Sequence, residues 1–343
     1  MLTRRQISTN STSLISFFLF CFVACTLFLM SLKCRKLQQE LQMRALSNEA
    51  LPFNVQDARH SRKLLSNLEQ LIFVGGVPRS GTTLMRAILD AHPDVRCGGE
   101  TMLLPSFLTW QAGWRTSWVN NSGITQEVFD DAVSAFITEI VAKHGDLAPR
   151  LCNKDPYTAL WLPTIRRLYP NSKFILMIRD ARAVIHSMVE RKVPVAGYNT
   201  SDETEMFTKW NQEIRKMTFQ CSNAPGQCIK VYYERLIQKP MDEVQRIVNF
   251  LDLPFSDQML RHQEFIGAEV DLNDQEFSAS QVKNSINTGP LTSWFDCFSE
   301  ELLSKLDDIA PFLNILGYDT STSKPDYSSF ARDSFYRFRN IYS

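Results

Sequence analysis

Residues 71–83 read LIFVGGVPRSGTT, an apolar run followed by a glycine-rich turn. The first four residues are typical of a buried strand, and apolar side chains then recur at helical spacing from Thr83 to Ala91. A turn of this kind between strand and helix directs backbone N–H groups and the positive helix end at a phosphate. We therefore predict a strand, a phosphate-binding turn and a helix.

The spacing from Gly76 to Gly81 matches that of a Walker A loop, but Thr82 stands where that loop needs a lysine. Because this lysine holds the terminal phosphates of a nucleoside triphosphate, an ATPase or kinase is disfavoured. The alternative is structural: glycines here also permit tight packing of a strand against a helix.

Strands and helices alternate along the rest of the chain. An apolar strand at 174–178 precedes a helix at 183–190, and a strand at 229–233 precedes a helix at 241–251. A further helix is predicted at 126–143. Repeated βα units indicate an α/β fold with a central parallel sheet flanked by helices. With 343 residues, one large domain is favoured over two.

A second phosphate-binding group is predicted at the end of the strand at 174–178. Arg179 follows this strand, and Ser187 and Arg191 lie four residues apart on one helical face. A hydroxyl and two guanidinium groups suit a phosphate, although a solvated surface helix explains the same pattern. The chain has 37 basic and 37 acidic residues, so a cationic site has to be local, and broad nucleic-acid binding is disfavoured.

The N-terminal region contains an uncharged apolar stretch at residues 14–32. At about 1.5 Å per residue this stretch is long enough to cross a bilayer core of about 30 Å. A cleaved signal peptide is the alternative, but Lys33, Arg35 and Lys36 follow the stretch instead of a small-residue cleavage site. Charges on both sides leave its orientation open. The polar residues 33–68 suit a stem.

Five cysteines follow the stem, and buried thiols and disulfides are both possible for them. Two glycosylation sequons, at Asn120 and Asn199, favour a lumenal domain. The five cysteines are Cys97, Cys152, Cys221, Cys228 and Cys297.

Together, the glycine-rich turn and the distal arginine and serine resemble the sulfotransferase superfamily. Residues 79–100, 152–156, 171–191 and 231–234 resemble protein-tyrosine sulfotransferases, and the match extends from about 71 to 318. The resemblance implies a P-loop-like sulfotransferase fold and a single-pass type II Golgi membrane protein that forms a homodimer. In that arrangement 1–13 is a cytosolic tail, 14–32 the transmembrane signal-anchor, 33–68 the stem, 69–320 the lumenal catalytic domain and 321–343 a C-terminal tail.

The activity implied by the resemblance is transfer of a sulfuryl group from 3'-phosphoadenylyl sulfate to tyrosine hydroxyls of secretory and membrane proteins, in acidic contexts, leaving 3',5'-ADP. A phenol with a pKa of about 10 benefits from a general base, and the family places its base at Glu100. Fixed cations stabilise the charge that develops on the leaving phosphate. The candidates for this stabilisation are Arg79, Lys154 and Ser278.

By the same resemblance, a set of residues binds the donor nucleotide and residues 102–106 bind the acceptor. The implied disulfides are Cys97 with Cys152 and Cys221 with Cys228, with Cys297 unpaired. The nucleotide-binding residues are Arg79, Ser80, Gly81, Thr82 and Thr83 for the 5'-phosphosulfate, Arg179, Ser187 and Arg191 for the 3'-phosphate, and Tyr233, Ser278 and Asn287. The acceptor-binding residues are Met102, Leu103, Leu104, Pro105 and Ser106.

The chain departs from the family pattern at three positions. Ser293 replaces a lysine before a tryptophan, and Met102 and Ser106 stand where close relatives have arginines. We expect a weakened preference for acidic acceptors and no essential metal, because the donor lacks the triphosphate that usually recruits magnesium. Two alternatives remain: a Golgi carbohydrate sulfotransferase, and a catalytically weakened nucleotide-binding homologue.

Overall fold

The computed structural model describes residues 70–114, 121–267, 270, 282–332 and 335–336. All of these fall within one compact unit, Leu64–Ser343. The predicted cytosolic tail, membrane anchor and stem lie outside the described residues. Within the described ranges, no helix has both the length and the apolar character needed to span a bilayer.

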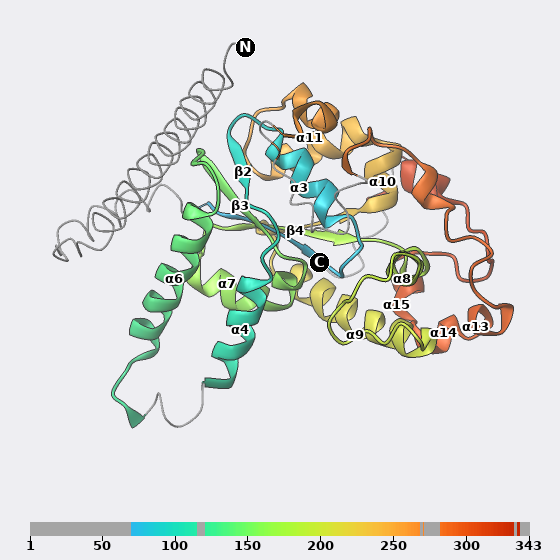
Figure 1. Ribbon diagram of the computed structural model, residues 1–343, viewed down its shortest axis with the longest axis horizontal. Helices are drawn as coiled ribbons and strands as arrows, with labels where there is room; N and C mark the ends of the chain where they lie inside the picture. Colours follow the sequence, from blue (N-terminus) through green and yellow to red (C-terminus); the bar gives the residue numbers. More distant parts are fainter. Residues whose placement is uncertain (1–69, 115–120, 268–269, 271–281, 333–334, 337–343) are drawn as a thin grey trace, which may run out of the picture. The chain divides into compact units, whose positions relative to one another are not determined.

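The core of the described structure is a sheet in which all paired strands run parallel, as the βα pattern predicted (Figure 1). The strand order is β2-β3-β1-β4-β5, so β1 lies at the centre. The strands are β1 (Ile72–Gly76), β2 (Val95–Cys97), β3 (Arg150–Lys154), β4 (Lys173–Ile178) and β5 (Cys228–Tyr232).

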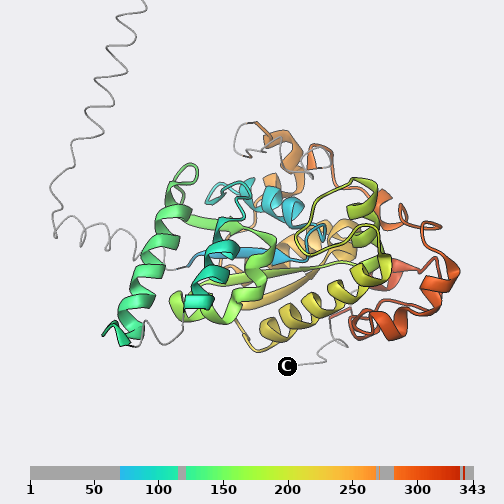
Figure 2. The same cartoon turned by 60° about the horizontal axis from the view of Figure 1, so that its bottom comes forward.

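Alternate side chains of β1 enter two separate apolar layers because successive residues of a strand point to opposite faces. Phe73 packs in the layer beneath α9, whereas Ile72 and Val74 pack in the layer beneath α3 and α11. Figure 2 shows α3 and α9 on opposite sides of the sheet. Both faces of the sheet are therefore covered, which explains why its strands read as continuous apolar runs.

The helices begin and end close to the predicted positions. The helix at 126–143 was predicted with the same bounds, and the other predicted helices differ by at most two residues at either end. The α-helices are α3 (Thr82–Asp90), α4 (Leu103–Trp114), α6 (Gln126–Lys143), α7 (Leu162–Leu168), α8 (Ala181–Glu190), α9 (Glu203–Ser222), α10 (Tyr233–Gln238), α11 (Pro240–Phe250), α13 (Glu300–Ser304), α14 (Leu306–Ile309) and α15 (Phe312–Ile315), and the 3₁₀ helices are η2 (Pro156–Trp161), η3 (Asp257–Phe265), η4 (Gly289–Leu291) and η5 (Tyr327–Ala331).

Several elements were not predicted from the sequence, among them β2, β3, α4 and α9. Strand β2 has only 3 residues, and β3 contains the polar residues Asn153 and Lys154, so neither has an apolar run. Helix α9 did carry a signal: its buried residues Met206, Trp210 and Met217 recur at helical spacing.

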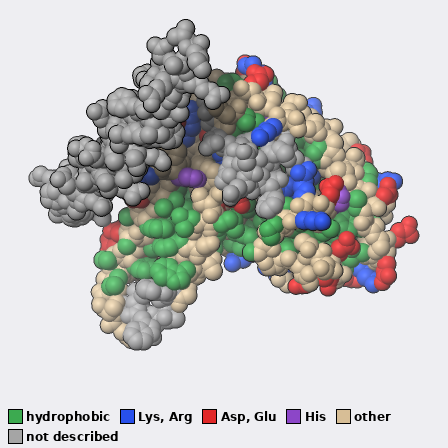
Figure 3. All heavy atoms as spheres, in the orientation of Figure 1, with side chains coloured by type: hydrophobic (Ala, Val, Ile, Leu, Met, Phe, Trp, Pro, Cys, Tyr) green, Lys and Arg blue, Asp and Glu red, His purple; other side chains and the backbone are tan. Residues whose placement is uncertain are grey.

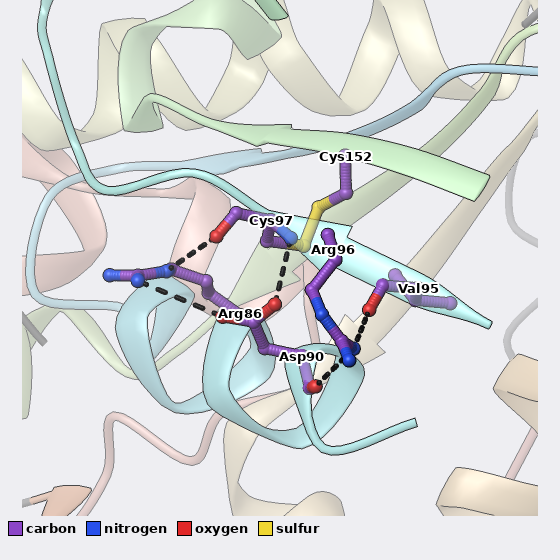
Figure 4. The surroundings of a disulfide bond; sticks show 6 residues. All are labelled: Arg86, Asp90, Val95, Arg96, Cys97 and Cys152. Carbon is purple, nitrogen blue, oxygen red and sulfur yellow. Dashed lines mark hydrogen bonds and ion pairs between the residues drawn. A yellow bond between two sulfur atoms is a disulfide. The ribbon is translucent and has the colours of Figure 1, made fainter. Parts of the chain in front are cut away.

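Both predicted disulfides are confirmed in the structure. Cys97 and Cys152 are paired in register across the parallel strands β2 and β3, and Figure 4 shows their bond beside Arg86 and Asp90 of α3. Asp90 accepts a hydrogen bond from the backbone N–H of Cys97 at 2.9 Å, and Arg86 donates to the carbonyl of Cys97 at 3.3 Å. The sheet edge at β2 is thus fixed to both β3 and α3.

The second disulfide joins Cys221 at the end of α9 to Cys228 at the start of β5. Cys297 is exposed and carries a free thiol, as the family pairing implied.

We expect the two disulfides to stabilise the domain unequally. They close loops with sequence separations of 55 and 7 residues. In the chain-entropy model these correspond to about 4 and about 2 kcal/mol. Urea unfolding of the Cys97→Ala/Cys152→Ala and Cys221→Ala/Cys228→Ala variants measures both losses. A larger loss from the second pair would contradict this ranking.

Candidate active site

The carboxyl ends of the strands bring the predicted site residues to one edge of the sheet. Lys154 is the last residue of β3, while Arg79, Arg179 and Tyr233 follow β1, β4 and β5. From β1 the sheet extends through β3 to β2 on one side and through β4 to β5 on the other. In open α/β sheets, such a reversal of strand order opens a crevice at the carboxyl ends where ligands bind.

The turn after β1 adopts a compact conformation that depends on its glycines. A Cβ atom at Gly81 would lie 2.5 Å from the ring of Tyr233, so glycine permits that ring to pack directly on the turn. Arg79 has φ 75°, in the left-handed region that non-glycine residues rarely adopt. The Ser80 hydroxyl is buried and, within the described structure, has no hydrogen-bond partner.

A pocket opens between this turn and the segment 282–290. Helix α3 starts at the pocket with Gly81 as N-cap and without a side-chain cap, so N–H groups of its first turn remain for an anion. The described lining residues are Arg79, Gly81, Thr82, Thr83, Leu84, Arg179, Tyr233, Ile237, Val282, Asn284, Ser285, Ile286, Asn287 and Pro290.

Three guanidinium groups crowd one end of this region. Burial is the main cause that lowers the pKa of Arg79 to about 10, and the positive charges of Arg191 and Arg179 lower it further. Arg179 donates to the carbonyl of Arg79 at 3.0 Å and lies 4.4 Å from the centre of the Tyr233 ring. Arg79 stays protonated near neutral pH, so the repulsion within this cluster favours binding of an anion.

Glu100 and Lys154 form an ion pair next to this edge. The Lys154 ammonium lies 2.5 Å from Glu100 Oε2; the lysine side chain is 0% exposed and the glutamate side chain 28% exposed. A buried cation therefore orients a carboxylate that still reaches solvent. That arrangement suits a base acting on a group that arrives from outside the protein.

The remaining predicted nucleotide residues are placed less uniformly. Ser187 accepts a hydrogen bond from Arg79 Nε at 3.0 Å, whereas Asn287 lines the pocket directly. The described lining residues include neither Ser187 nor Arg191. Ser278 lies outside the described residues, and so does the sequon residue Asn120. Asn199 is exposed.

The predicted acceptor segment divides into buried and accessible residues. Leu104 and Pro105 are buried, and Leu104 belongs to the hydrophobic core beneath α4. Leu103 and Ser106 are exposed and Met102 is half-buried, so these three form the surface that an acceptor can reach.

Sequence analysis missed Asp155 and Glu234 as parts of the site. Both are buried carboxylates that hold backbone N–H groups of neighbouring loops. Each follows a predicted site residue directly, but the sequence carries no signal for the loops that they bind. It also missed Asn284, Ser285, Ile286 and Pro290, which line the pocket beside Asn287.

Comparisons with known proteins indicate the family of the chain. Residues 70–257 match the model of the "Sulfotransferase family". A Caenorhabditis briggsae protein named "Putative protein-tyrosine sulfotransferase" is 87% identical over 280 residues, covering 82% of this chain and 100% of that protein. Homo sapiens protein-tyrosine sulfotransferase 1 is 44% identical over 265 residues, covering 75% of this chain and 72% of that protein. The chain belongs to the protein-tyrosine sulfotransferase family.

A solved structure supports the fold assignment. The sulfotransferase domain from the curacin biosynthetic pathway superposes with a TM-score of 0.50 at 22% identity, covering 73% of this chain and 98% of that domain. At this identity the likeness concerns the fold alone. It agrees with the P-loop-like sulfotransferase fold that the sequence predicted.

In this member of the protein-tyrosine sulfotransferase family, a buried network joins the turns after β4 and β5. Glu234 accepts hydrogen bonds from the Asp180 backbone N–H and the Tyr318 hydroxyl, both at 2.9 Å. Asp180 in turn accepts from Arg182 at 2.7 Å and from the Tyr327 hydroxyl at 2.8 Å. The network fixes Arg179 and Tyr233, the neighbours of Asp180 and Glu234, and anchors the segment at 318–327.

The pKa of Glu234 is raised from 4.5 to about 7, mainly by burial and also by the nearby Asp180 carboxylate, while the hydrogen bond from the Asp180 backbone N–H and the charge of Arg179 oppose the shift. The folded protein thus holds a proton that the unfolded chain loses above about pH 4.5. The resulting stability is fully present below that pH and is lost as pH rises through about 7. At 1.36 kcal/mol per pH unit, the loss is at most about 3 kcal/mol.

We expect Glu234→Gln to remove this pH dependence, because glutamine cannot ionise. The free energy of unfolding of the variant minus that of the wild type should be larger at pH 8 than at pH 5. Urea unfolding at both pH values provides the measurement. Parallel stability profiles for the two proteins would show that Glu234 stays ionised in the folded state.

Proposed function

We propose that the chain transfers a sulfuryl group from 3'-phosphoadenylyl sulfate to tyrosine hydroxyls of secretory and membrane proteins. Membership of the protein-tyrosine sulfotransferase family supports this activity. The observation that carries the mechanism is the Glu100–Lys154 ion pair at the same sheet edge as the arginine cluster. A base and an anion site at one edge are what this transfer requires.

The pocket has the donor set for an anionic nucleotide. The uncapped N-terminus of α3 suits the 5'-phosphosulfate, and Arg179 suits a second phosphate. The Tyr233 ring, already stacked on Arg179, offers an apolar surface to the nucleoside. Ser187 accepts a hydrogen bond from Arg79 and so holds the Arg79 guanidinium in position to bind the phosphate. Arg191 contributes positive charge next to Arg79.

Glu100 is the general base of the proposed reaction. Its carboxylate takes the phenol proton while the phenol oxygen forms a bond to sulfur and the bond between sulfur and the phosphate oxygen breaks. Lys154 holds the carboxylate in place from its buried side. A phenol has a pKa of about 10 and is therefore a weak nucleophile at neutral pH. A positioned general base increases the rate of such a reaction by roughly 10²–10⁴-fold.

Arg79 stabilises the charge that develops on the leaving phosphate. Its side chain lines the pocket and its guanidinium is held by Ser187. Preorganised donors of this kind act without the reorganisation that water needs. Ser278 is proposed to assist on the strength of the family resemblance. We propose that no metal ion takes part, because the donor lacks the triphosphate that usually recruits magnesium and the 5'-phosphate of the departing 3',5'-ADP faces fixed cations.

The proposed enzyme is a single-pass type II Golgi protein with a lumenal catalytic domain and acts as a homodimer. The apolar stretch at 14–32 and two disulfides in the described domain support the compartment. Figure 3 shows hydrophobic side chains gathered over the region of α4 and α6. Exposed Trp110 of α4 and Val128 of α6 suit a contact between two copies.

We expect Glu100→Ala to lower the rate of transfer to a tyrosine peptide by about 10²-fold or more. The affinity for 3',5'-ADP should stay close to that of the wild type, because the carboxylate acts on the acceptor. Transfer of labelled sulfate from the donor measures the rate, and calorimetry measures the affinity.

Glu139→Ala is a matched control, since Glu139 also pairs with a lysine, Lys143, but lies on the exposed face of α6. This control should retain full activity. Retention of more than half the wild-type rate by Glu100→Ala would rule out Glu100 as the base. Transfer by the wild type to a glycan but not to the peptide would favour the carbohydrate sulfotransferase.

Acceptor charge is a second determinant to test, because Met102 and Ser106 cannot hold a carboxylate. Lys154 is fully buried against Glu100, so its ammonium cannot replace the missing arginines. We expect Met102→Arg with Ser106→Arg to increase several-fold the preference for an acidic peptide over its amide counterpart, since each exposed ion pair adds about 0.2–1 kcal/mol. The gain should be largest at low salt.

The readout is the ratio of kcat/KM for the two peptides at two ionic strengths. Thr109→Arg with Ala112→Arg adds the same charge to exposed positions of α4 but about 10 Å further along the helix. This control should leave the ratio unchanged. An equal increase in both double variants would show that net charge, not the loop, selects the acceptor.

A further inference from the structure

The loop that carries Glu100 contacts three residues of one neighbouring segment, which consists of β3 and Asp155, the residue that follows β3. The Cys97–Cys152 disulfide lies at the start, and the Glu100–Lys154 ion pair follows. The third attachment is made by Asp155, which binds the two residues after Glu100. The disulfide and the ion pair fix the loop before and at the base, and Asp155 fixes the backbone beyond it.

Asp155 is fully buried, and its carboxylate faces four donors. Oδ1 accepts hydrogen bonds from the backbone N–H groups of Thr101 at 2.9 Å and Met102 at 2.8 Å. Oδ2 accepts from the Thr101 hydroxyl at 3.3 Å and from the Asn153 amide at 3.2 Å. A buried carboxylate is costly unless it is satisfied in this way, so these bonds fix the position of the loop relative to β3.

The backbone at Met102 needs such an anchor. Its φ of 56° lies in the left-handed region, which is unfavourable for a residue with a Cβ atom. Such a conformation persists only where surrounding contacts hold it. Asp155 binds the N–H of Met102 itself and that of the preceding residue, which makes it the contact best placed to hold the strained turn.

We propose that Asp155 is a positioning residue for the base Glu100. Lys154 holds only the tip of the Glu100 side chain, so the backbone that carries it must be fixed separately. Without Asp155 the strained turn relaxes and the carboxylate shifts from the acceptor oxygen. A displacement of about 1 Å near reacting atoms can lower a rate by about 10²-fold. This role rests on the proposed transfer with Glu100 as base.

The test compares Asp155→Ala with Asp155→Asn. The alanine variant should lower the single-turnover rate of transfer by about 10²-fold while its affinity for 3',5'-ADP changes less than twofold. The asparagine variant should recover most of the rate, because its Oδ1 still accepts both backbone N–H groups. Its amide N–H can donate to Asn153 Oδ1 once the Asn153 amide flips, since that oxygen is buried and, in the described structure, unpartnered.

Glu243→Ala is the matched control, because it also removes a fully buried carboxylate but at a site away from the loop that carries Glu100. Glu243, on α11, accepts hydrogen bonds from Arg235 at 3.1 Å and Tyr336 at 2.7 Å. It should lower thermal stability as Asp155→Ala does and leave the single-turnover rate unchanged. If Asp155→Ala does not fold, Asp155→Ser, which retains one acceptor, should lose about tenfold in rate.

Hydrogen exchange separates this proposal from the proposed function. The amides of Thr101 and Met102 should exchange slowly in the wild type and in Asp155→Asn, and fast in Asp155→Ala. A wild type that transfers nothing to tyrosine would overturn the proposed function, and the exchange rates would still decide whether Asp155 holds the loop. Unchanged exchange or an unchanged rate in Asp155→Ala, or an equal rate loss in Glu243→Ala, would overturn the role of Asp155.

Discussion

The parallel pairing of β1 with β3 on one side and β4 on the other is the constraint on which the site depends. Parallel strands end at the same edge of a sheet, so Lys154, Arg79 and Arg179 meet there although they are far apart in sequence. Both faces of the sheet are covered by helices, which leaves this edge as the place where charged groups can face a ligand. The same strand pairing therefore determines both the fold of the sheet and the placement of the charged residues at the candidate site.

Charged groups at this edge are buried only where a partner compensates them. Lys154 is fully buried and pairs with Glu100, while the Asp155 carboxylate receives N–H and hydroxyl donors. Burial without such partners would cost several kcal/mol for each charge, roughly. The arginine cluster differs, because its members repel one another. Glu100 opposes this repulsion at Arg79, and an anionic ligand would oppose it further.

Backbone strain is found at two places that flank the proposed reaction. Arg79 and Met102 both have positive φ; Arg79 lies in the turn after β1, and Met102 lies two residues after Glu100. The carbonyl of Arg79 is held by Arg179, and the N–H of Met102 by Asp155. Each strained residue is thus fixed by a group from a neighbouring strand end. Hydrogen bonds from distant parts of the chain thus hold these two residues in a backbone conformation that is unfavourable for them on their own.

The sequence by itself determined the βα pattern, the glycine-rich turn at 75–83 and the residue types of the candidate site. Apolar periodicity and glycine placement are local properties, so residues 71–83 already predicted a strand, a turn and a helix. Only the tertiary structure decided which residues meet. Strand β3 contains polar residues and so carries no apolar run, and its position beside β1 arises from pairing between distant segments. For the same reason Asp155 and Glu234 gave no signal, because a buried carboxylate acquires its role from loops that the fold brings to it.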